Sequence, residues 1–287
     1  MEKEEIIRII LGDQAHIVSP MLGGMMNNSF LVDNNNQKYI LYIATEQANE
    51  MVDRKEELNH LEMVYELGIT SKNIYFDVTK GIKINDFIPG HSLNHLEEYD
   101  VSKIANILKT LHESGLKSNL DYKPFERFVG FEKEAKQYSS LDETYLRLRK
   151  IIFDNKDYLT NVKQVLSHND FQKSNIVRSE DDHYYMIDFE FMANNAEHYD
   201  IACFGNDKVE EGFALLKAYF GENLTDDDIK RFYLWRIFIS LQWFLVAIIK
   251  HYRGEGKAHQ IDFLSVANHF INNALEAEKN LIDKMLM

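Results

Sequence analysis

Residues 166–176 read Leu-Ser-His-Asn-Asp-Phe-Gln-Lys-Ser-Asn-Ile, and residues 186–190 read Met-Ile-Asp-Phe-Glu. The first stretch places Asp170 and Asn175 five positions apart in a polar loop between apolar residues. The second places Asp188 at the end of a short strand-like run. Magnesium prefers hard oxygen ligands such as carboxylates and amides, and a carboxylate can also accept the proton of an incoming hydroxyl. The two stretches therefore predict a site for phosphoryl transfer from a magnesium-bound nucleotide.

An Asp and an Asn at this spacing also have a simpler explanation. Both side chains are common in turns, where they hydrogen-bond the local backbone. The order of the parts favours the site, because the polar loop, the second acidic stretch, a Gly-Gly turn and a candidate hinge all occur in one chain. The turn explanation remains open for each residue taken alone.

Composition limits the classes of protein that the chain can belong to. Its 287 residues are 45% hydrophobic, which is enough for a large core. The net charge of −14 argues against a nucleic-acid partner, but not against a nucleotide, because bound magnesium reverses the local sign. The single cysteine, Cys203, fits a reducing cytosol. The N-terminus lacks signal-peptide order and residues 233–249 contain Arg236 and Gln242, so we expect a cytoplasmic protein without membrane insertion.

The motifs resemble those of a known family. The run His-Asn-Asp-Phe-Gln with its later Asn, then Ile-Asp-Phe-Glu-Phe and Tyr-Asp-Ile-Ala, is similar to the choline/ethanolamine kinase family, including its bacterial LicA-type members. The wider group is the aminoglycoside-phosphotransferase-like kinases. The resemblance runs from about residue 22 to the last helices. It implies an α+β, protein-kinase-like fold of two lobes: a small antiparallel-sheet lobe, residues 1–89, and a larger, mainly helical lobe, residues 90–287.

The resemblance implies ATP and Mg²⁺ as cofactors and assigns roles to the motif residues. Asp170 would act as base or position the hydroxyl, while Asn175 and Asp188 would bind magnesium. Gln172 would line the metal or acceptor side. Glu190 would either stand behind the ligands or face the substrate. All of these groups are expected to converge on the nucleotide triphosphate between the two lobes.

Two upstream segments are nucleotide-binding candidates. Two glycines before a polar tract can let backbone amides approach phosphate, although a plain hairpin explains the same pattern. In the resembled family the matching segment covers the ATP phosphates. The Pro-Gly pair at residues 89–90 marks either a generic linker or the hinge that meets adenine. The candidates are Gly23, Gly24, Asn27, Asn28 and Ser29 in the turn, and Asp86, Phe87 and Ile88 in the hinge.

One position departs from the family pattern. Kinases of this type carry Lys or Arg on the strand at residues 38–43, and the aligned residue here is Tyr42, a neutral phenol. The family glutamate that partners this cation corresponds to Glu57. We expect either that Arg54, one turn away, supplies the missing charge or that Arg54 and Glu57 form an exposed helical ion pair of little energetic value.

The acceptor side also matches the family only in part. A quaternary ammonium needs aromatic faces and nearby acids. Choline kinases supply two tryptophans spaced i, i+3 on a late helix, and here Trp243 matches the first while Val246 occupies the second place. Tyr199 is a further candidate, although a core role is the default for aromatics at helical spacing. Choline is the expected acceptor, then ethanolamine, with an aminoglycoside or a sugar as the alternative.

A second class of function is a nucleotide-binding pseudokinase with little turnover. Tyr42 is its main support, since loss of the strand cation would weaken phosphate binding. Retention of Asp170, Asn175 and Asp188 favours the enzyme. No Ala-Pro-Glu segment follows Asp188, so protein kinase activity is not expected.

Periodicity and turn residues predict the remaining elements. We expect helices at 2–11, 45–67 and 101–114, strands at 38–43, 74–76, 82–84 and 183–187, and a turn at 33–36. Residues 125–157 should form charged helices of an exposed insert. Asp200 should either cap the helix that follows it or brace the catalytic loop.

Overall fold

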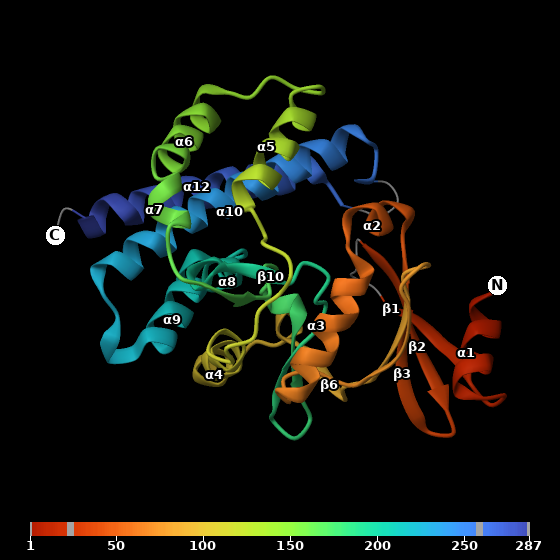
Figure 1. Ribbon diagram of the computed structural model, residues 1–287. Helices are drawn as coiled ribbons and strands as arrows, with labels where there is room; N and C mark the ends of the chain where they lie inside the picture. The colour runs from red at the N-terminus through yellow and green to blue at the C-terminus, as the bar shows by residue number, and fades with distance from the viewer. Residues whose placement is uncertain (1, 22–25, 257–260, 286–287) are drawn as a thin grey trace. The chain divides into compact units, whose positions relative to one another are not determined.

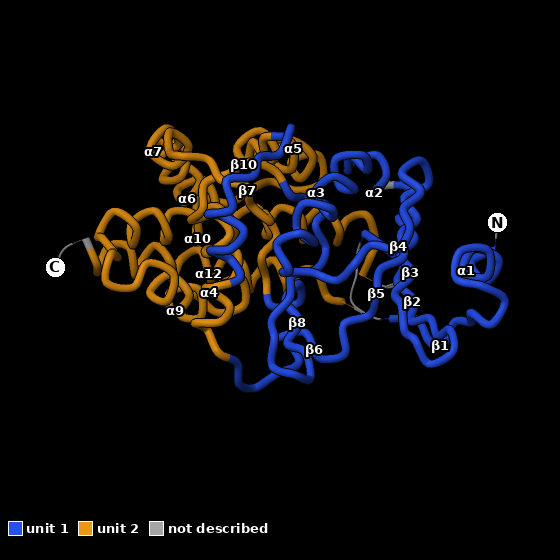
Figure 2. Tube along the Cα trace, turned by 60° about the horizontal axis from the view of Figure 1, so that its bottom comes forward, with its two compact units in different colours: residues 1–99, 107–120, 173–192 blue, residues 100–106, 121–172, 193–287 orange. Residues whose placement is uncertain are grey.

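The computed structural model describes residues 2–21, 26–256 and 261–285. The chain forms two compact units, coloured separately in Figure 2. Unit 1 comprises residues 1–99, 107–120 and 173–192, and unit 2 comprises residues 100–106, 121–172 and 193–287. These units follow packing rather than chain order, and the lobe boundary between residues 89 and 90 stays a prediction.

Unit 1 contains a five-stranded antiparallel sheet with strand order β1-β2-β3-β5-β4. A tight turn at Asn35 and Asn36 joins β2 to β3, and both residues have positive φ, as tight hairpin turns require and as Asn tolerates. This confirms the turn expected within residues 33–36. The strands expected at residues 38–43, 74–76 and 82–84 are also present. The strands are β1 His16–Met21, β2 Asn27–Asn34, β3 Gln37–Ala44, β4 Asn73–Asp77 and β5 Ile82–Asp86.

The two faces of this sheet have different chemistry. Side chains alternate along a strand, and directly paired residues share a face. Leu41 pairs with Ile84, and both belong to the apolar core that α1 (Lys3–Leu11) covers with Ile6 and Ile7. The helices α1 and α3 lie on opposite sides of the sheet (Figures 1 and 2). The residues next to Leu41 and Ile84 therefore face away from the apolar core.

The prediction of a single helix over residues 45–67 is wrong. The chain forms α2 (Glu46–Met51) and α3 (Arg54–Glu66), with a break at Val52 and Asp53. The break has a local cause: the Asp53 side chain accepts hydrogen bonds from the backbone N–H groups of Lys55 and Glu56, which makes it the N-cap of a new helix. Beyond α3, Gly68 has φ +70°, the left-handed conformation expected after a helix end.

Two further parts of unit 1 come from distant sequence. A three-stranded antiparallel sheet has the order β6-β8-β9. The backbone N–H of Met186 donates to the carbonyl of Ile69, which ties β9 to the segment that follows α3. Helix α4 (Val101–His112) contributes its first part to unit 2 and its second to unit 1. The elements are β6 Gly90–Ser92, η1 Leu93–His95, η2 Lys173–Asn175, β8 Ile176–Ser179 and β9 Tyr184–Met186.

Unit 2 is mainly helical, with one two-stranded ladder in which β7 pairs with β10. Its long central helix, α10, packs extensively along α12. The capping box at the start of α10 pairs Thr225 with Asp228. The elements are α5 Pro124–Ala135, α6 Glu143–Asp154, α7 Lys156–Thr160, β7 Gln164–Ser167, β10 Ala193–Ala196, α8 Glu197–Phe204, α9 Val209–Phe220, η3 Gly221–Asn223, α10 Asp226–Tyr252 and α12 Phe263–Met285.

An aromatic cluster forms the core of unit 2. The ring of Phe238 on α10 lies 4.8 Å from that of Phe125, 5.1 Å from Phe128 and 5.2 Å from Trp235, measured between centroids. Phe125 and Phe128 are both buried, so the expectation that residues 125–157 form an exposed insert is wrong. The helices are present, but their apolar faces pack on α10.

Helix α10 is long and apolar enough to cross a membrane by length and composition. Of its most apolar 18-residue window, with a mean hydropathy of 1.8, 78% is buried inside the protein. Burial of this kind is typical of a core helix that is hydrophobic all round. The sheet of unit 1 and the helices of unit 2 together give the α+β fold that the sequence predicts.

Candidate active site

The loop at residues 168–172 follows β7 in unit 2 and is fastened by Asp200 on α8. The Asp200 carboxylate accepts hydrogen bonds from the backbone N–H groups of His168 and Asn169, each at 2.7 Å. Asp200 is fully buried and is the fourth residue of α8, whose N-cap is Ala196. Of the two roles expected for Asp200, bracing the loop is therefore the one observed.

The side chain of Asn169 fixes the same loop from its other side. Asn169 has φ +65°, a left-handed conformation that non-glycine residues adopt infrequently. Its Nδ2 donates to the carbonyls of Ser167 and Ala193 at 3.1 and 3.3 Å, and its Oδ1 accepts from Asn195 Nδ2 at 2.8 Å. These bonds link the loop to both strands of the β7–β10 ladder and hold the unusual backbone in place.

Asp170 is half-buried at the end of this braced turn. Its backbone N–H donates to His168 Nδ1 at 3.3 Å, so His168 holds the loop. The side chain of Gln172 donates Nε2 to both carboxylate oxygens of Asp170, at 3.0 and 3.2 Å. Gln172 was expected on the metal or acceptor side, and in this structure its amide orients the Asp170 carboxylate.

The proposed magnesium ligands Asn175 and Asp188 lie at the base of the β8–β9 hairpin in unit 1. The carbonyl of Asn175 accepts from the backbone N–H of Ile187 at 2.9 Å, next to the Ile176–Met186 pair of the ladder. Asp188 has φ +67°, a strained conformation for a non-glycine residue and one that is typical of functional sites. The hairpin therefore fixes the backbone of both residues.

The donor set fits magnesium. Among the described residues, no group of three or more His, Cys, Asp or Glu side chains is arranged to hold a metal ion by itself. Asn175 and Asp188 offer two hard oxygen ligands, which suits an ion that takes its remaining ligands from nucleotide phosphates and water.

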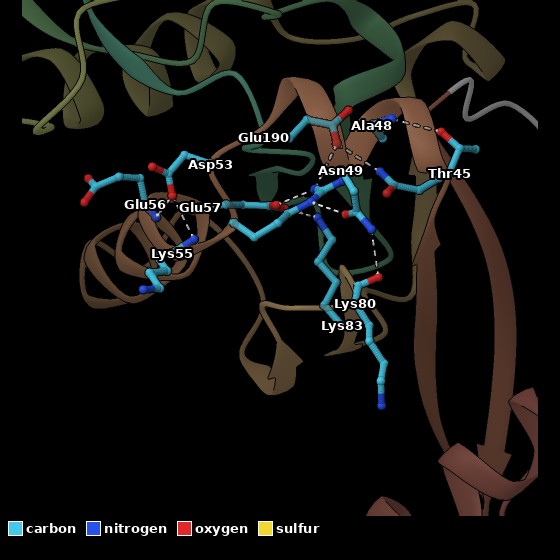
Figure 3. A network of polar contacts seen from close by, with 12 residues as sticks. Thr45, Ala48, Asn49, Asp53, Lys55, Glu56, Glu57, Lys80, Lys83 and Glu190 are labelled. Atoms are coloured by element: carbon cyan, nitrogen blue, oxygen red, sulfur yellow. Dashed lines mark hydrogen bonds and ion pairs between the residues drawn. The ribbon is translucent and has the colours of Figure 1, made fainter. Parts of the chain in front are cut away.

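A buried polar network on unit 1 connects α3, β5 and residue 190 (Figure 3). Lys83 Nζ lies 2.5 Å from Glu57 Oε1, and Arg54 Nη1 lies 2.6 Å from Glu57 Oε2. Glu190 Oε2 accepts from Asn27 Nδ2 at 3.1 Å and lies 3.5 Å from Arg54 Nη1. All four charged side chains of the network are at most 5% exposed. The Arg54–Glu57 pair is therefore buried, and the expectation of an exposed helical ion pair is wrong.

The charges of this network shift one another's pKa values. Burial alone would raise the pKa of Glu57, but Lys83 and Arg54 outweigh it and leave that pKa below its ordinary value. Burial alone would lower the pKa of Lys83, but the carboxylates of Glu57, Asp188 and Glu190 raise it. Burial and the Asp188 charge raise the pKa of Glu190 to about 7. With Asp188 counted, the network thus contains three carboxylates, of Glu57, Asp188 and Glu190, but only two cations, Lys83 and Arg54. Of the three carboxylates, Glu190 has its pKa raised.

Lys83 is a residue that the sequence reasoning missed. It is 3% exposed and lies opposite Tyr42 in the β3–β5 ladder, with its Nζ 4.9 Å from the centre of the Tyr42 ring. Burial raises the pKa of Tyr42 to about 12, so its phenol stays neutral. The signal in the sequence was a charged residue between Ile82 and Ile84, which alternation places on the polar face of the strand.

The residues of the predicted phosphate-covering turn are placed only in part. Gly23 and Gly24 lie outside the described residues. Asn27 is buried with its side chain on Glu190, Asn28 is exposed, and Ser29 is half-buried. These three begin β2, so the polar tract is a strand rather than an irregular loop.

The predicted hinge begins at Asp86, the last residue of β5, and continues through Phe87 and Ile88. The backbone N–H of Asp86 donates to the Lys72 carbonyl at 2.9 Å, and that of Phe87 donates to the Lys38 carbonyl at 3.1 Å. Within residues 2–21, 26–256 and 261–285, the N–H of Ile88 has no such protein acceptor. Adenine recognition by this segment stays a prediction, and Ile88 is the residue whose backbone donor remains for it.

The aromatic candidates for the acceptor site pack within unit 2. Tyr199 is 1% exposed, and its ring lies edge-on to Trp235 at 5.1 Å and to Tyr122 at 5.2 Å. Trp243 is half-buried and stacks on Phe270 of α12, with 5.9 Å between centroids. Both rings have a packing role, and contact with an acceptor stays a prediction for each.

Comparison with known proteins identifies the class and then the family. The structure is similar to choline kinase LicA from Streptococcus pneumoniae, with a TM-score of 0.75 and 24% identity over 98% of this chain and 97% of the other. It is also similar to a choline/ethanolamine kinase family protein from Mesorhizobium loti, with a TM-score of 0.76 and 16% identity over 94% and 93% of the two chains. These likenesses define the protein-kinase-like fold of small-molecule phosphotransferases.

The sequence supports the narrower assignment. Residues 18–211 match the choline/ethanolamine kinase family. Protein LicA of Haemophilus influenzae is 24% identical over 272 residues, which cover 88% of this chain and 78% of that protein. The chain belongs to the choline/ethanolamine kinase family and is a phosphotransferase. This confirms the family and the fold class that the sequence motifs predict.

Proposed function

We propose that the protein transfers the γ-phosphoryl group of ATP to the hydroxyl of a small amino alcohol, with choline as first candidate and ethanolamine as second. One observation carries the proposal: Asp170 stands on a loop whose backbone is fastened by Asp200, with its carboxylate oriented by Gln172. A carboxylate held in one orientation suits a group that must meet one hydroxyl proton.

The proposed reaction forms one bond and breaks one. The acceptor oxygen bonds to the γ-phosphorus, and the bond from that phosphorus to the β–γ bridging oxygen breaks. The products are the phosphate ester, ADP and one proton, which Asp170 accepts from the hydroxyl. Asn175 and Asp188 are the residues that would hold magnesium, which when bound neutralises charge on the phosphates. Positioning by the chain's own residues is the main requirement, because the protein contributes little covalent chemistry to such transfers.

Related structures support a nucleotide cofactor. A LicA structure contains AMP, and a spectinomycin phosphotransferase of similar fold, with a TM-score of 0.64, contains ADP and spectinomycin. ATP is the matching phosphoryl donor. The buried Lys83 also weakens the pseudokinase alternative, whose main support was the neutral Tyr42.

The test is ADP release from Mg-ATP over a panel of alcohols at equal concentration. The panel contains choline, ethanolamine, an aminoglycoside and a sugar, with trimethylamine as an ammonium control that has no hydroxyl. Acceptor-dependent ADP release is expected with choline or ethanolamine and not with trimethylamine. Release with the aminoglycoside or the sugar alone would overturn the amino-alcohol assignment. Binding of Mg-ATP without turnover of any alcohol would favour the pseudokinase.

A further inference from the structure

We propose that Lys83 on β5 is the cation that binds the nucleotide phosphates, in place of the β3 position that Tyr42 occupies. The inference rests on the proposed function and names a binding residue for it. The two residues form a direct pair in the β3–β5 ladder, and the Lys83 ammonium lies 4.9 Å from the centre of the Tyr42 ring. A lysine on the neighbouring strand β5 thus lies beside the β3 position at which the family carries its cation.

The sheet places both side chains on its polar face. Leu41 and Ile84, the preceding and following neighbours of the pair, are fully buried in the apolar core beneath α1. Because side chains alternate, Tyr42 and Lys83 point to the other side, where α3 carries Glu57. A lysine at position 83 therefore meets the same glutamate that a lysine at position 42 would be expected to meet.

The ammonium of Lys83 retains the capacity to bind a ligand. Lys carries three N–H donors, and within the part of the chain that the structure describes only Glu57 supplies Lys83 Nζ with an oxygen acceptor. The Tyr42 ring contributes a cation–π contact, which stabilises the charge without using a directed hydrogen bond. Two donors are thus open to phosphate oxygens.

Arg54 has a different role in the same network. Its Nε donates to Asn49 at 3.1 Å, and its Nη1 contacts both Glu57 and Glu190. These bonds link α2, α3 and residue 190, so Arg54 holds the carboxylates that surround Lys83. Its Nε and Nη1 are engaged with protein groups, and among the described residues its Nη2 has no hydrogen-bond partner. Lys83 is distinguished from Arg54 by its direct pairing with Tyr42 in the β3–β5 ladder.

The local charge explains why a cation is needed here. The carboxylates of Glu57, Asp188 and Glu190 all act on Lys83, as their effect on its pKa shows. Removing the ammonium would leave three carboxylates against the single charge of Arg54, and a triphosphate would be repelled. The Lys83 ammonium would therefore offset part of the negative charge of these three carboxylates and also attract the phosphates of the nucleotide.

The test compares Lys83→Met with Lys80→Met. Lys80 lies on the same hairpin, its side chain is 58% exposed, and its pairing with Asp77 is a surface ion pair, so it controls for loss of one charge. Calorimetric titration measures the affinity of each full-length variant for Mg-ATP and for adenosine. Lys83→Met should weaken Mg-ATP binding about 10- to 100-fold, as expected for loss of a charged hydrogen bond. Adenosine affinity and the behaviour of Lys80→Met should stay as in wild type.

A third variant provides a test that still works if Lys83→Met folds poorly. Tyr42→Lys/Lys83→Met returns an ammonium to the same face from the neighbouring strand, and it should recover most of the Mg-ATP affinity. No recovery, an equal loss of adenosine affinity, or unchanged Mg-ATP affinity in Lys83→Met would each overturn the assignment of Lys83. Wild-type protein that binds no Mg-ATP would overturn the proposed function together with it.

Discussion

The carboxylate of Asp200 on α8 accepts a 2.7 Å hydrogen bond from the backbone N–H of Asn169, whose φ is +65°. The same carboxylate accepts a second bond from His168, so one buried acid holds two successive amides of the loop that ends in Asp170. A neutral amide at position 200 offers a single acceptor oxygen for these two donors. The geometry of the loop therefore depends on both side-chain oxygens of Asp200.

Asp200→Asn should lower both the stability of the protein and its turnover number. We expect about 2–4 kcal/mol less stability, from one unsatisfied buried donor and the strain at Asn169. The turnover number should fall roughly 100-fold, because Asp170 is displaced. Denaturant unfolding and ADP release measure the two effects, with the exposed Asp283→Asn as control. Wild-type turnover in Asp200→Asn would show that the brace has no part in catalysis.

Arg54→Ala should destabilise unit 1. The guanidinium contacts Glu57, Glu190 and Asn49, and the Arg54 side chain is only 5% exposed. Glu57 keeps Lys83 in the variant, so the loss should be about 2–4 kcal/mol, somewhat below that for a buried pair that loses its only partner. Urea unfolding measures it against Arg178→Ala, whose ion pair with Asp182 is exposed and should matter by less than about 0.5 kcal/mol. Equal stability of the two variants would contradict the buried network.

Two glycines in helices give opposite predictions for the same substitution. A Cβ on Gly212 of α9 would lie 2.9 Å from the Gly205 Cα, a backbone atom that cannot move aside. Gly212→Ala should therefore cost about 1–3 kcal/mol. A Cβ on Gly130 of α5 meets no atom within 4 Å, and Gly130→Ala should stabilise by about 0.5–1 kcal/mol through helix propensity. Thermal unfolding of both variants measures the difference, and a shift of equal sign would contradict the packing of α8 on α9.

The pH dependence of stability should include a contribution from Asp228. Burial opposes ionisation, but hydrogen bonds from His198 and Thr225 outweigh it and lower the pKa of Asp228 to about 2. A carboxyl with a depressed folded-state pKa stabilises the protein above its unfolded value near 4, and the stabilisation disappears as the pH falls toward 2. After allowance for solvent screening the effect is about 1 kcal/mol.

The matching experiment uses Asp228→Asn. Its unfolding free energy should lie below that of wild type at pH 6, and the difference should shrink between pH 4 and pH 2. Asp226→Asn, which changes an exposed acid in the same helix turn, is the control. A difference that stays constant down to pH 2 would show that the ionised Asp228 adds nothing.

Local patterns made much of the fold predictable. The alternation at residues 38–43, the asparagines of the β2–β3 turn and the glycine after α3 each act over a few residues, and each prediction is confirmed. The failures had tertiary causes. Asp53 begins a new helix within an apparently continuous pattern, and the charged surface of residues 125–157 conceals Phe125 and Phe128, whose burial depends on α10.

The candidate site shows the same limit. The spacing of Asp170 to Asn175 is a local signal, and the sequence displayed it directly. Lys83 could not be found by aligning a single strand, because its relation to Tyr42 arises only when β3 and β5 pair. Gln172 likewise became an orienting group for Asp170 only once the side-chain geometry was known.

The most direct test of the account is the turnover number of Asp170→Asn in ADP release from Mg-ATP with the best amino alcohol of the panel. Loss of the proton acceptor should reduce it about 10²- to 10⁴-fold, while the affinity for Mg-ATP stays within about twofold of wild type. Turnover by Asp170→Asn at the wild-type rate would contradict the assignment of Asp170 as the base, and with it the proposed chemistry.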